Sequence, residues 1–267
     1  MMRWGYSFVL AALLACPAQA QEPPESKIRQ FDIPTLEKLG RDMYAQDQAG
    51  WHATDALHNI RSRDELRKEN VRGWIVVNRP QGPLVRFIRM GDAGPEAAYD
   101  ISDLRGRPVV SVPADRQLTD EEKAIFAARS HAIASIEAGC AENYNTVVLK
   151  DPEGDGWLAW ALASTTKPDT VVTLGHRRLT VSADGSKVLR MDALSLSCGT
   201  MSVKDEDGNI TKAVMMTQLV ARLPVETYVF LSLQHPLPFL VMTAKDTVWM
   251  VHKGSISKFD MGQSSKP

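Results

Sequence analysis

The chain has 267 residues and a nearly balanced charge, with 31 lysines and arginines against 32 aspartates and glutamates. Removal of an N-terminal leader that contains Arg3 would leave 30 against 32, a formal charge of −2. This balance argues against nucleic acid as a partner, because nucleic-acid binding needs a basic surface. No segment stays apolar for the roughly 20 residues that a spanning helix requires, so we expect a soluble protein without a membrane span.

Residues 1–20 have the pattern of a secretory signal peptide. Arg3 precedes an unbroken apolar run over 8–15, and small residues occupy the expected cleavage site before Gln21. The apolar run is too short to span a bilayer. We therefore expect export and a mature chain that begins at Gln21, in the periplasm or secreted.

The alternative route is a lipoprotein that is acylated at Cys16. Leu14 is bulkier than such a site usually carries, and Pro17 follows the cysteine directly. These neighbours favour simple export over a lipid anchor.

Cleavage of the leader leaves two cysteines, Cys140 and Cys198, in an oxidising compartment. We expect them to form a disulfide, and two buried free thiols are the alternative. A bridge between positions 58 apart would remove roughly 4 kcal/mol of unfolded-state entropy in the chain-entropy model. Two thiolates without a CxxC motif do not suggest zinc, and no other cofactor is expected.

A long amphipathic helix is predicted over residues 34–60. Apolar residues recur at intervals of three and four from Leu36 onward, and the stripe weakens in the middle. Asp32 or Thr35 is expected to cap the N-terminus. At Gly50 another element approaches closely or the helix bends.

A charged stretch at 61–70 leads into short β-like runs and then a second helix. The helix is predicted from Thr119 to Gly139, because Thr119 and Glu122 form a capping box and Gly139 stands where a C-terminal stop belongs. The β-like runs are 73–79, 84–90, 98–104 and 108–112.

The sequence pattern predicts β-strands over nearly all of residues 144–260. Asp-Gly connections between apolar runs are the strongest short-range hairpin signal, and three occur here, at 151–156, 182–186 and 205–209. They predict an antiparallel meander in which 170–181 is a single strand. The stretch 226–259 is expected to add two strands around its proline-containing loop and a third after it.

These elements predict an α+β protein: an antiparallel β-meander packed on the Thr119 to Gly139 helix, preceded by a smaller region of one helix and short strands. The smaller region covers 21–115, the helix and sheet cover 116–267, and the linker lies at 113–117. The smaller region is either a separate domain or a layer over the same sheet.

The acidic segment at 151–156 has two interpretations. Asp151, Glu153 and Asp155 followed by Gly156 fit the start of an EF-hand calcium loop. The twelfth position should then be glutamate, but it is Leu162. We therefore interpret the segment as a hairpin turn.

Three segments resemble a family of secreted Gram-negative bacterial proteins with no assigned function. They are "YNTVVLKDPEGDGWLAW" (144–160), "GHRRLTVSADGSKVLR" (175–190) and "VFLSLQHPLPFLV" (229–241). The resemblance implies export and carries no activity, fold or catalytic residue with it.

His52, Asp55 and His58 are the candidate metal ligands. They stand at i, i+3 and i+6 on the first helix and fan across roughly 120° of its surface. An imidazole–carboxylate–imidazole row could ligate a divalent metal or tune a general base. The alternative is a solvated helix face, since the row lacks the HExxH signature.

His176, Arg178 and Trp157 are the binding candidates. Strand alternation puts His176 and Arg178 on one face, where they could hold a carboxylate or phosphate, although an exposed sheet face is often cationic. Trp157 and Trp160 are three apart on a strand and face opposite sides. One is expected in the core, and the other under a helix or exposed to a ligand.

The function favoured by these patterns is a non-catalytic binding or interaction module, an envelope accessory or inhibitor-like protein. Its partner is an unknown protein or small-molecule ligand of the envelope. The alternative is a secreted hydrolase with a dispersed His/Asp site, metal-assisted or not. A deep pocket with convergent titratable groups would favour the enzyme, and a flat or apolar patch would favour binding.

Overall fold

The computed structural model describes residues 26–104, 106–136, 140–204, 207–235, 237–244 and 247–260. The expected signal peptide lies outside the described residues. In the described part of the chain there are four helices and fourteen strands, and most strand pairs are antiparallel. The predicted α+β class is therefore confirmed. No helix in these ranges is long and apolar enough to cross a membrane.

The first helix, α1 (Ile33–His58), matches the helix predicted over 34–60. Its N-terminus is capped by Asp32, whose carboxylate accepts a hydrogen bond from the Thr35 backbone N–H at 2.9 Å. The buried residues along α1 recur at the predicted intervals. Both the helix and its cap are confirmed.

A short helix that the sequence analysis missed, α2 (Arg63–Lys68), lies in the charged stretch 61–70. Ser62 and Glu65 form a capping box, with reciprocal hydrogen bonds of 3.2 and 2.7 Å. Leu66 is the buried residue of this helix. One apolar residue gives no repeating face, so periodicity could not reveal α2.

The first sheet contains the four short runs that the sequence predicted. Its strands are antiparallel neighbours in chain order. They are β1 (Val71–Arg79), β2 (Gly82–Gly91), β3 (Gly94–Ser102) and β4 (Val109–Ser111).

The predicted second helix is α3 (Asp120–Ala134). The capping box of Thr119 and Glu122 is present, and the last turn is closed at Ser135. Gly139, the expected stop, lies outside the described residues.

The second sheet is antiparallel in the order β5-β6-β8-β9, and α3 packs against it. Its hairpins at 151–156 and 182–186 join neighbouring strands, as predicted from their Asp-Gly pairs. The strands are β5 (Asn143–Lys150), β6 (Trp157–Ser164), β8 (Arg177–Val181) and β9 (Val188–Ala193).

The single strand predicted over 170–181 is wrong. Gly175 has a φ of +96°, a conformation that favours glycine, and it separates β7 (Thr170–Leu174) from β8. β7 leaves the second sheet and pairs with β10 (Gly199–Ser202). A simple meander is therefore not formed.

The strand predicted at the start of 226–259 is also wrong, because this segment is a helix, α4 (Glu226–Gln234). Most of α4 is buried, including the polar Glu226 and Thr227. A helix buried on all sides has no amphipathic period, and a short apolar run cannot then be distinguished from a buried strand.

The last sheet has the order β11-β12-β13-β14. β11 pairs with β12 in parallel, so the third Asp-Gly connection does not join neighbouring strands of one meander. Its flanks are joined by an isolated bridge between Lys204 and Ile210 and by a hydrogen bond from the Thr211 N–H to the Val203 carbonyl at 2.9 Å. The strands are β11 (Val214–Thr217), β12 (Phe239–Ala244), β13 (Thr247–His252) and β14 (Ser255–Phe259).

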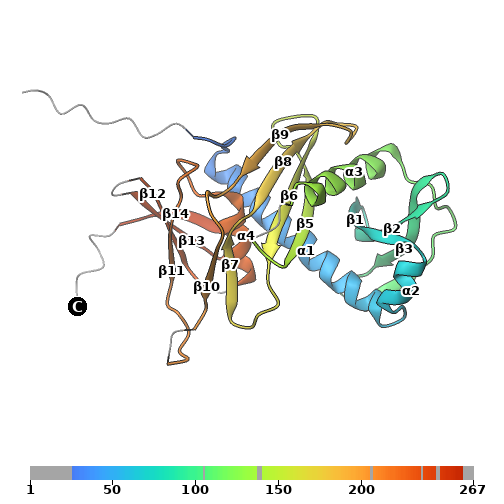
Figure 1. The fold of residues 1–267 in the computed structure, drawn as a ribbon, viewed down its shortest axis with the longest axis horizontal. Helices are drawn as coiled ribbons and strands as arrows, with labels where there is room; N and C mark the ends of the chain where they lie inside the picture. The colour runs from blue at the N-terminus through green and yellow to red at the C-terminus, as the bar shows by residue number, and fades with distance from the viewer. Residues whose placement is uncertain are drawn as a thin grey trace, which may run out of the picture.

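Helix α1 connects the two ends of the molecule. Figure 1 shows it running diagonally from the β12–β14 sheet to the β1–β3 sheet. It contacts α4 and β5 on the way. One buried cluster joins Ile75 and Ile88 of the first sheet to Leu179 of the second. The predicted linker at 113–117 stays a prediction.

Cys140 and Cys198 form the predicted disulfide, with their Cα atoms 5.0 Å apart. The bridge ties the segment between α3 and β5 to the segment before β10. It also passes the corner at Gly175, where an added Cβ would lie 2.8 Å from the Cys140 Cβ.

We expect replacement of both cysteines by serine to lower the free energy of unfolding by up to about 4 kcal/mol, because the bridge closes a long loop in the unfolded chain. Guanidinium denaturation measures the change. A reductant should produce the same loss in the wild-type protein and none in the double variant. Equal stabilities of the oxidised wild type and the variant would contradict the expectation.

Candidate functional site

Arg178 binds anions that the chain itself supplies. It lies on β8, is 1% exposed, and its Nη1 donates to both carboxylate oxygens of Glu226, at 3.0 and 3.1 Å. Its Nη2 donates to the carboxylate of Asp192 at 2.9 Å. The guanidinium is therefore enclosed and already paired with carboxylates of the chain, and the ligand-binding role of Arg178 stays a prediction.

The buried charges hold three other segments in place. The Trp160 indole N–H donates to Glu226 at 2.8 Å, and Arg190 pairs with Asp192 at 2.6 Å. Arg178 also donates to the backbone carbonyl of Arg29, whose N–H donates to Asp192 at 3.3 Å. The N-terminal segment, the second sheet and α4 thus meet at one charged cluster.

The acidic segment at 151–156 is a turn, as predicted. The Asp151 N–H donates to the Gly156 carbonyl at 3.0 Å. The guanidinium of Arg29 binds the Asp151 carboxylate at 2.5 and 2.8 Å and reaches Glu153 at 3.1 Å. Burial alone would raise the pKa of Asp151, but the Arg29 hydrogen bonds hold it below its ordinary value. These carboxylates stabilise the N-terminal segment.

His176 is a buried structural side chain. It is 3% exposed, and its Nδ1 accepts a hydrogen bond from the Ala163 N–H at 3.1 Å. Burial lowers the pKa of His176 to about 4, and a weaker interaction with the Val172 backbone opposes this shift. The imidazole continues the pairing of β6 beyond the end of β8, and its role in binding stays a prediction.

Trp157 and Trp160 face opposite sides of the second sheet, as predicted. Trp160 lies in the largest buried cluster, and Trp157 lies in the cluster beneath α3. Trp157 is 5% exposed and its indole N–H donates to the Ala183 carbonyl at 3.0 Å. Trp157 is therefore a core residue, and its contact with a ligand stays a prediction.

His52, Asp55 and His58 are not brought together as a metal site. Among the described residues no group of three or more His, Cys, Asp or Glu side chains is placed to hold a metal ion. His52 and Asp55 are exposed, and the His58 Nδ1 lies 3.4 Å from the Arg61 carbonyl oxygen. Spacing along one helix spreads these side chains apart, so the alternative of a solvated face describes them.

Three hollows that share lining residues lie beside α1, β5 and the end of α4, and we refer to them together as the groove. The Trp hollow has a volume of about 450 Å³. It is lined by Asp47, Gln48, Gly50, Trp51, Thr54, Trp74, Asn145 and Gln234.

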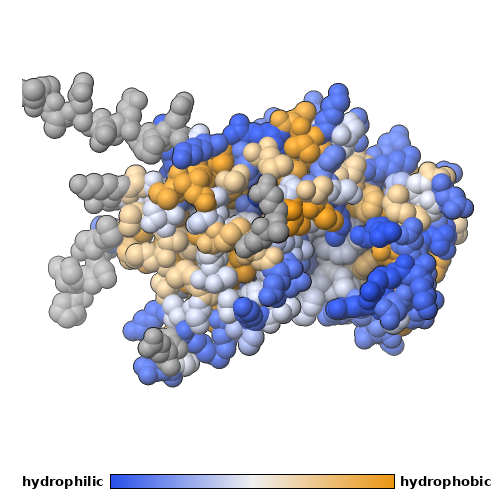
Figure 2. All heavy atoms as spheres, in the orientation of Figure 1, coloured by the Kyte–Doolittle hydropathy of each residue, from blue (hydrophilic) through white to orange (hydrophobic). Residues whose placement is uncertain are grey.

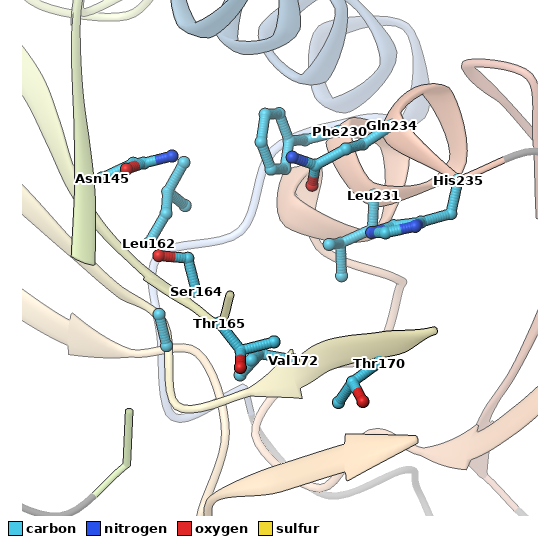
Figure 3. Close-up of a pocket in the computed structure, with 11 residues that line it drawn as sticks. Asn145, Leu162, Ser164, Thr165, Thr170, Val172, Phe230, Leu231, Gln234 and His235 are labelled. Atoms are coloured by element: carbon cyan, nitrogen blue, oxygen red, sulfur yellow. The ribbon is translucent and has the colours of Figure 1, made fainter. Parts of the chain in front are cut away.

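The amide hollow adjoins it, because both are lined by Asn145 and Gln234. It has a volume of about 90 Å³ and also receives His235 and Phe230 from α4 and its C-cap. Figure 3 shows Asn145 of β5 and Gln234 of α4 extending toward one another across this space. These two amides mark the narrow part of the groove.

The threonine hollow adjoins the amide hollow on the other side. It has a volume of about 450 Å³ and is lined by Cys140, Ala141, Glu142, Ser164, Thr165, Lys167, Thr170, Val172 and Thr200. Ser164, Thr165, Thr170 and Val172 line both hollows. The Cys140–Cys198 bridge therefore lies at this end of the groove.

Trp74 is held in position on both sides. A Cβ on Gly50 would lie 2.2 Å from the Trp74 ring, so only glycine allows this contact. The Arg129 guanidinium lies 5.7 Å from the centre of the same ring, and burial lowers the pKa of Arg129 to about 10. The close approach expected as one of two possibilities at Gly50 is confirmed.

Asp47 is the buried carboxyl of the Trp hollow. It is 7% exposed, and the Asn145 amide donates to it at 3.1 Å. Burial raises the pKa of Asp47, and the Asn145 hydrogen bond opposes the rise. Among the described residues no lysine or arginine pairs with Asp47, so its oxygens retain capacity to accept hydrogen bonds.

A second surface feature is the edge strand β9. Val188, Leu189 and Met191 are 39%, 64% and 50% exposed. Figure 2 shows hydrophobic residues at the surface over this strand. An exposed apolar edge can pair with another chain, but it is separate from the groove.

Comparisons with protein-family models, curated proteins and solved structures find no match. The groove was not found from the sequence because its residues come from α1, β1, β5, β6, β7, β10, α4 and the loops between them. Gly50 was the one local signal, since it marked where Trp74 approaches α1.

We expect Arg178→Met to lower the free energy of unfolding by about 3 to 5 kcal/mol, because it leaves the buried Glu226 carboxylate without its cation and removes one of the two cations that pair with Asp192. Arg177→Met is the matched control, since Arg177 is on the same strand but only half-buried. Urea unfolding of both variants measures the difference. Similar losses in the two variants would contradict a special role for the buried cluster.

His176→Asn should reduce the free energy of unfolding that the protein loses as the pH falls below 7. The folded-state pKa of His176 is about 4, below its ordinary value of 6.5, so the unfolded chain takes up a proton first as the pH falls. Stability is therefore lost from about pH 6.5 down to pH 4, by on the order of 3 kcal/mol. Asn keeps an acceptor for Ala163 and does not titrate.

Urea unfolding at pH 7 and about pH 4.5 measures this loss, and His52→Asn serves as the exposed control. The wild type and the control should lose more stability than His176→Asn. Equal losses in all three proteins would show that another group dominates.

Proposed function

We propose that this chain is an exported binding protein of the periplasm or the extracellular space, and that its ligand lies along the groove. The signal-peptide pattern of 1–20 and the Cys140–Cys198 disulfide support export. The observation that carries the binding proposal is the Trp hollow. It places a buried carboxyl with unused acceptor capacity beside two indoles.

The lining of the groove favours binding over catalysis. The Trp and amide hollows are lined mainly by amides, hydroxyls and aromatic rings, and their titratable side chains are Asp47 and His235. Burial lowers the pKa of His235, which favours its neutral form. A few polar groups in a partly apolar recess are typical of ligand recognition.

The second candidate function is a hydrolase in which Asp47 is the general acid. Its raised pKa inside a recess is the specific observation in favour, because catalytic acids are often tuned this way. Glycoside hydrolysis commonly needs a pair of carboxyls. The carboxyls that line the groove, Asp47 and Glu142, belong to different hollows. His176 does not line the groove, so it is not the acid–base element of this candidate.

Hydrogen exchange of the mature protein, with and without a small-molecule and glycan extract of the native envelope, tests the binding proposal. We expect protection of amides around residues 47–54 and in β5. Gln234→Ala removes one amide from the narrow part of the groove. About ten times more ligand should then be needed to give the same protection. Gln117→Ala is the matched control, because Gln117 is exposed and lies outside the groove.

Protection confined to β9 would contradict the groove and point to the apolar edge. Hydrolysis of an extract component that stops in Asp47→Asn would support the enzyme instead. No protection anywhere, with material from the native envelope in excess, would also contradict the binding proposal.

A further inference from the structure

We propose that the ligand of the groove is a neutral carbohydrate chain. This inference rests on the proposed function and adds the chemical class of the ligand. It depends on three features of the lining: the two indoles, the planar polar groups beside them, and the position of the charges.

The indoles provide surfaces for sugar rings. Trp51 is 55% exposed although it lines the Trp hollow, and Trp74 lines the same hollow from β1. Trp74 is fixed between the Gly50 backbone and the Arg129 guanidinium. A sugar ring presents apolar C–H faces and polar edges, and an aromatic side chain with an apolar face and a polar rim matches it. The hollow is therefore suited to rings that stack.

The polar groups next to the indoles suit hydroxyls. A carboxylate accepts hydrogen bonds at two oxygens, and an amide both donates and accepts. Asp47 uses one oxygen for Asn145, while Gln48 and Gln234 line the same hollow. Adjacent hydroxyls can each donate to Asp47 and accept from an amide. A bound sugar would supply the donors that burial has taken from the Asp47 carboxylate.

The charges favour a neutral chain. In the Trp and amide hollows the described lining includes Asp47 and no lysine or arginine. A uronate or phosphate there would be repelled by the Asp47 carboxylate without a cation to offset it. The lysine of the groove, Lys167, lines the threonine hollow together with Glu142.

A bound peptide would leave the indoles, the Asp47 carboxyl and the amides of the groove without partners. Extended peptides are commonly bound by addition to a sheet edge, through main-chain hydrogen bonds. The edge strands β1 and β5 contribute the Trp74 and Asn145 side chains to the groove, and the apolar edge strand β9 lies outside it. Two large hollows joined by a narrow one fit a chain of several sugars better than a single sugar.

The test is binding of the mature protein to a panel of neutral tetrasaccharides built from glucose, mannose, galactose or N-acetylglucosamine, with tetragalacturonate and tetra-alanine alongside. Calorimetry and tryptophan fluorescence give the dissociation constants. We expect at least one neutral tetrasaccharide to bind, and its monosaccharide and tetragalacturonate to bind at least tenfold more weakly.

Two groove variants and one control locate the site. Trp51→Ala should weaken binding about tenfold, because an exposed stacking surface is lost without disturbing the core. Asp47→Asn should weaken it about tenfold at pH 7. It should also remove a pH dependence in which wild-type binding strengthens as Asp47 ionises. Leu189→Ala changes an exposed apolar residue of β9 and should leave binding unchanged.

The outcomes separate the two proposals. Binding of tetra-alanine that Trp51→Ala weakens, with no tetrasaccharide bound, would overturn the carbohydrate inference and leave the groove as a binding site. Tighter binding of tetragalacturonate than of the neutral sugars would overturn the inference as well. Sugar binding that both groove variants retain would place the ligand elsewhere and contradict the proposed function too.

Discussion

The buried charge of Arg178 is the constraint on which the arrangement of the second sheet and α4 depends. A guanidinium that is 1% exposed is tolerated only where anions and acceptors surround it, and these come from Glu226, Asp192 and the Arg29 backbone. Glu226 is the first residue of α4, so the same contact fixes where that helix begins. The far end of α4 carries Gln234 into the groove. The internal ion cluster thus positions a wall of the candidate site without touching it.

Helix α1 supplies the opposite wall by a different kind of contact. It packs on α4 and β5 through buried apolar residues, and Gly50 lets the Trp74 ring lie directly on its backbone. Asp47 and Trp51 lie within one turn of Gly50 on either side, so the glycine that admits Trp74 also sets the spacing of the polar and aromatic groups. The Trp hollow lies where Gly50 of α1 meets Trp74 of the first sheet.

The parts of the fold that the sequence predicted are those with local physical causes. Asp-Gly pairs reversed the chain at 151–156 and 182–186, capping residues placed the starts of α1 and α3, and Cys140 paired with Cys198. The sequence predictions were wrong where tertiary contacts determine the secondary structure. The apolar segment of α4 has no period because all its sides are buried, and the break at Gly175 depends on where β7 finds a partner. The groove assembles residues from seven helices and strands that are far apart in the chain, so no short stretch of sequence contains it.

The side chains that looked most reactive in the sequence are those that the fold uses internally. Arg178, His176 and Asp151 have partners within the chain, and their perturbed surroundings follow from structural burial. Charge patterns in a sequence reveal strong interactions but do not say whether the partner is internal. The amides, hydroxyls and indoles of the groove form no recognisable pattern in the sequence. They form a candidate binding site only because the fold brings them together. Asp47 illustrates this best, because no sequence pattern singled it out within the predicted helix. In the fold it is a buried carboxyl that still has room for hydrogen bonds from outside.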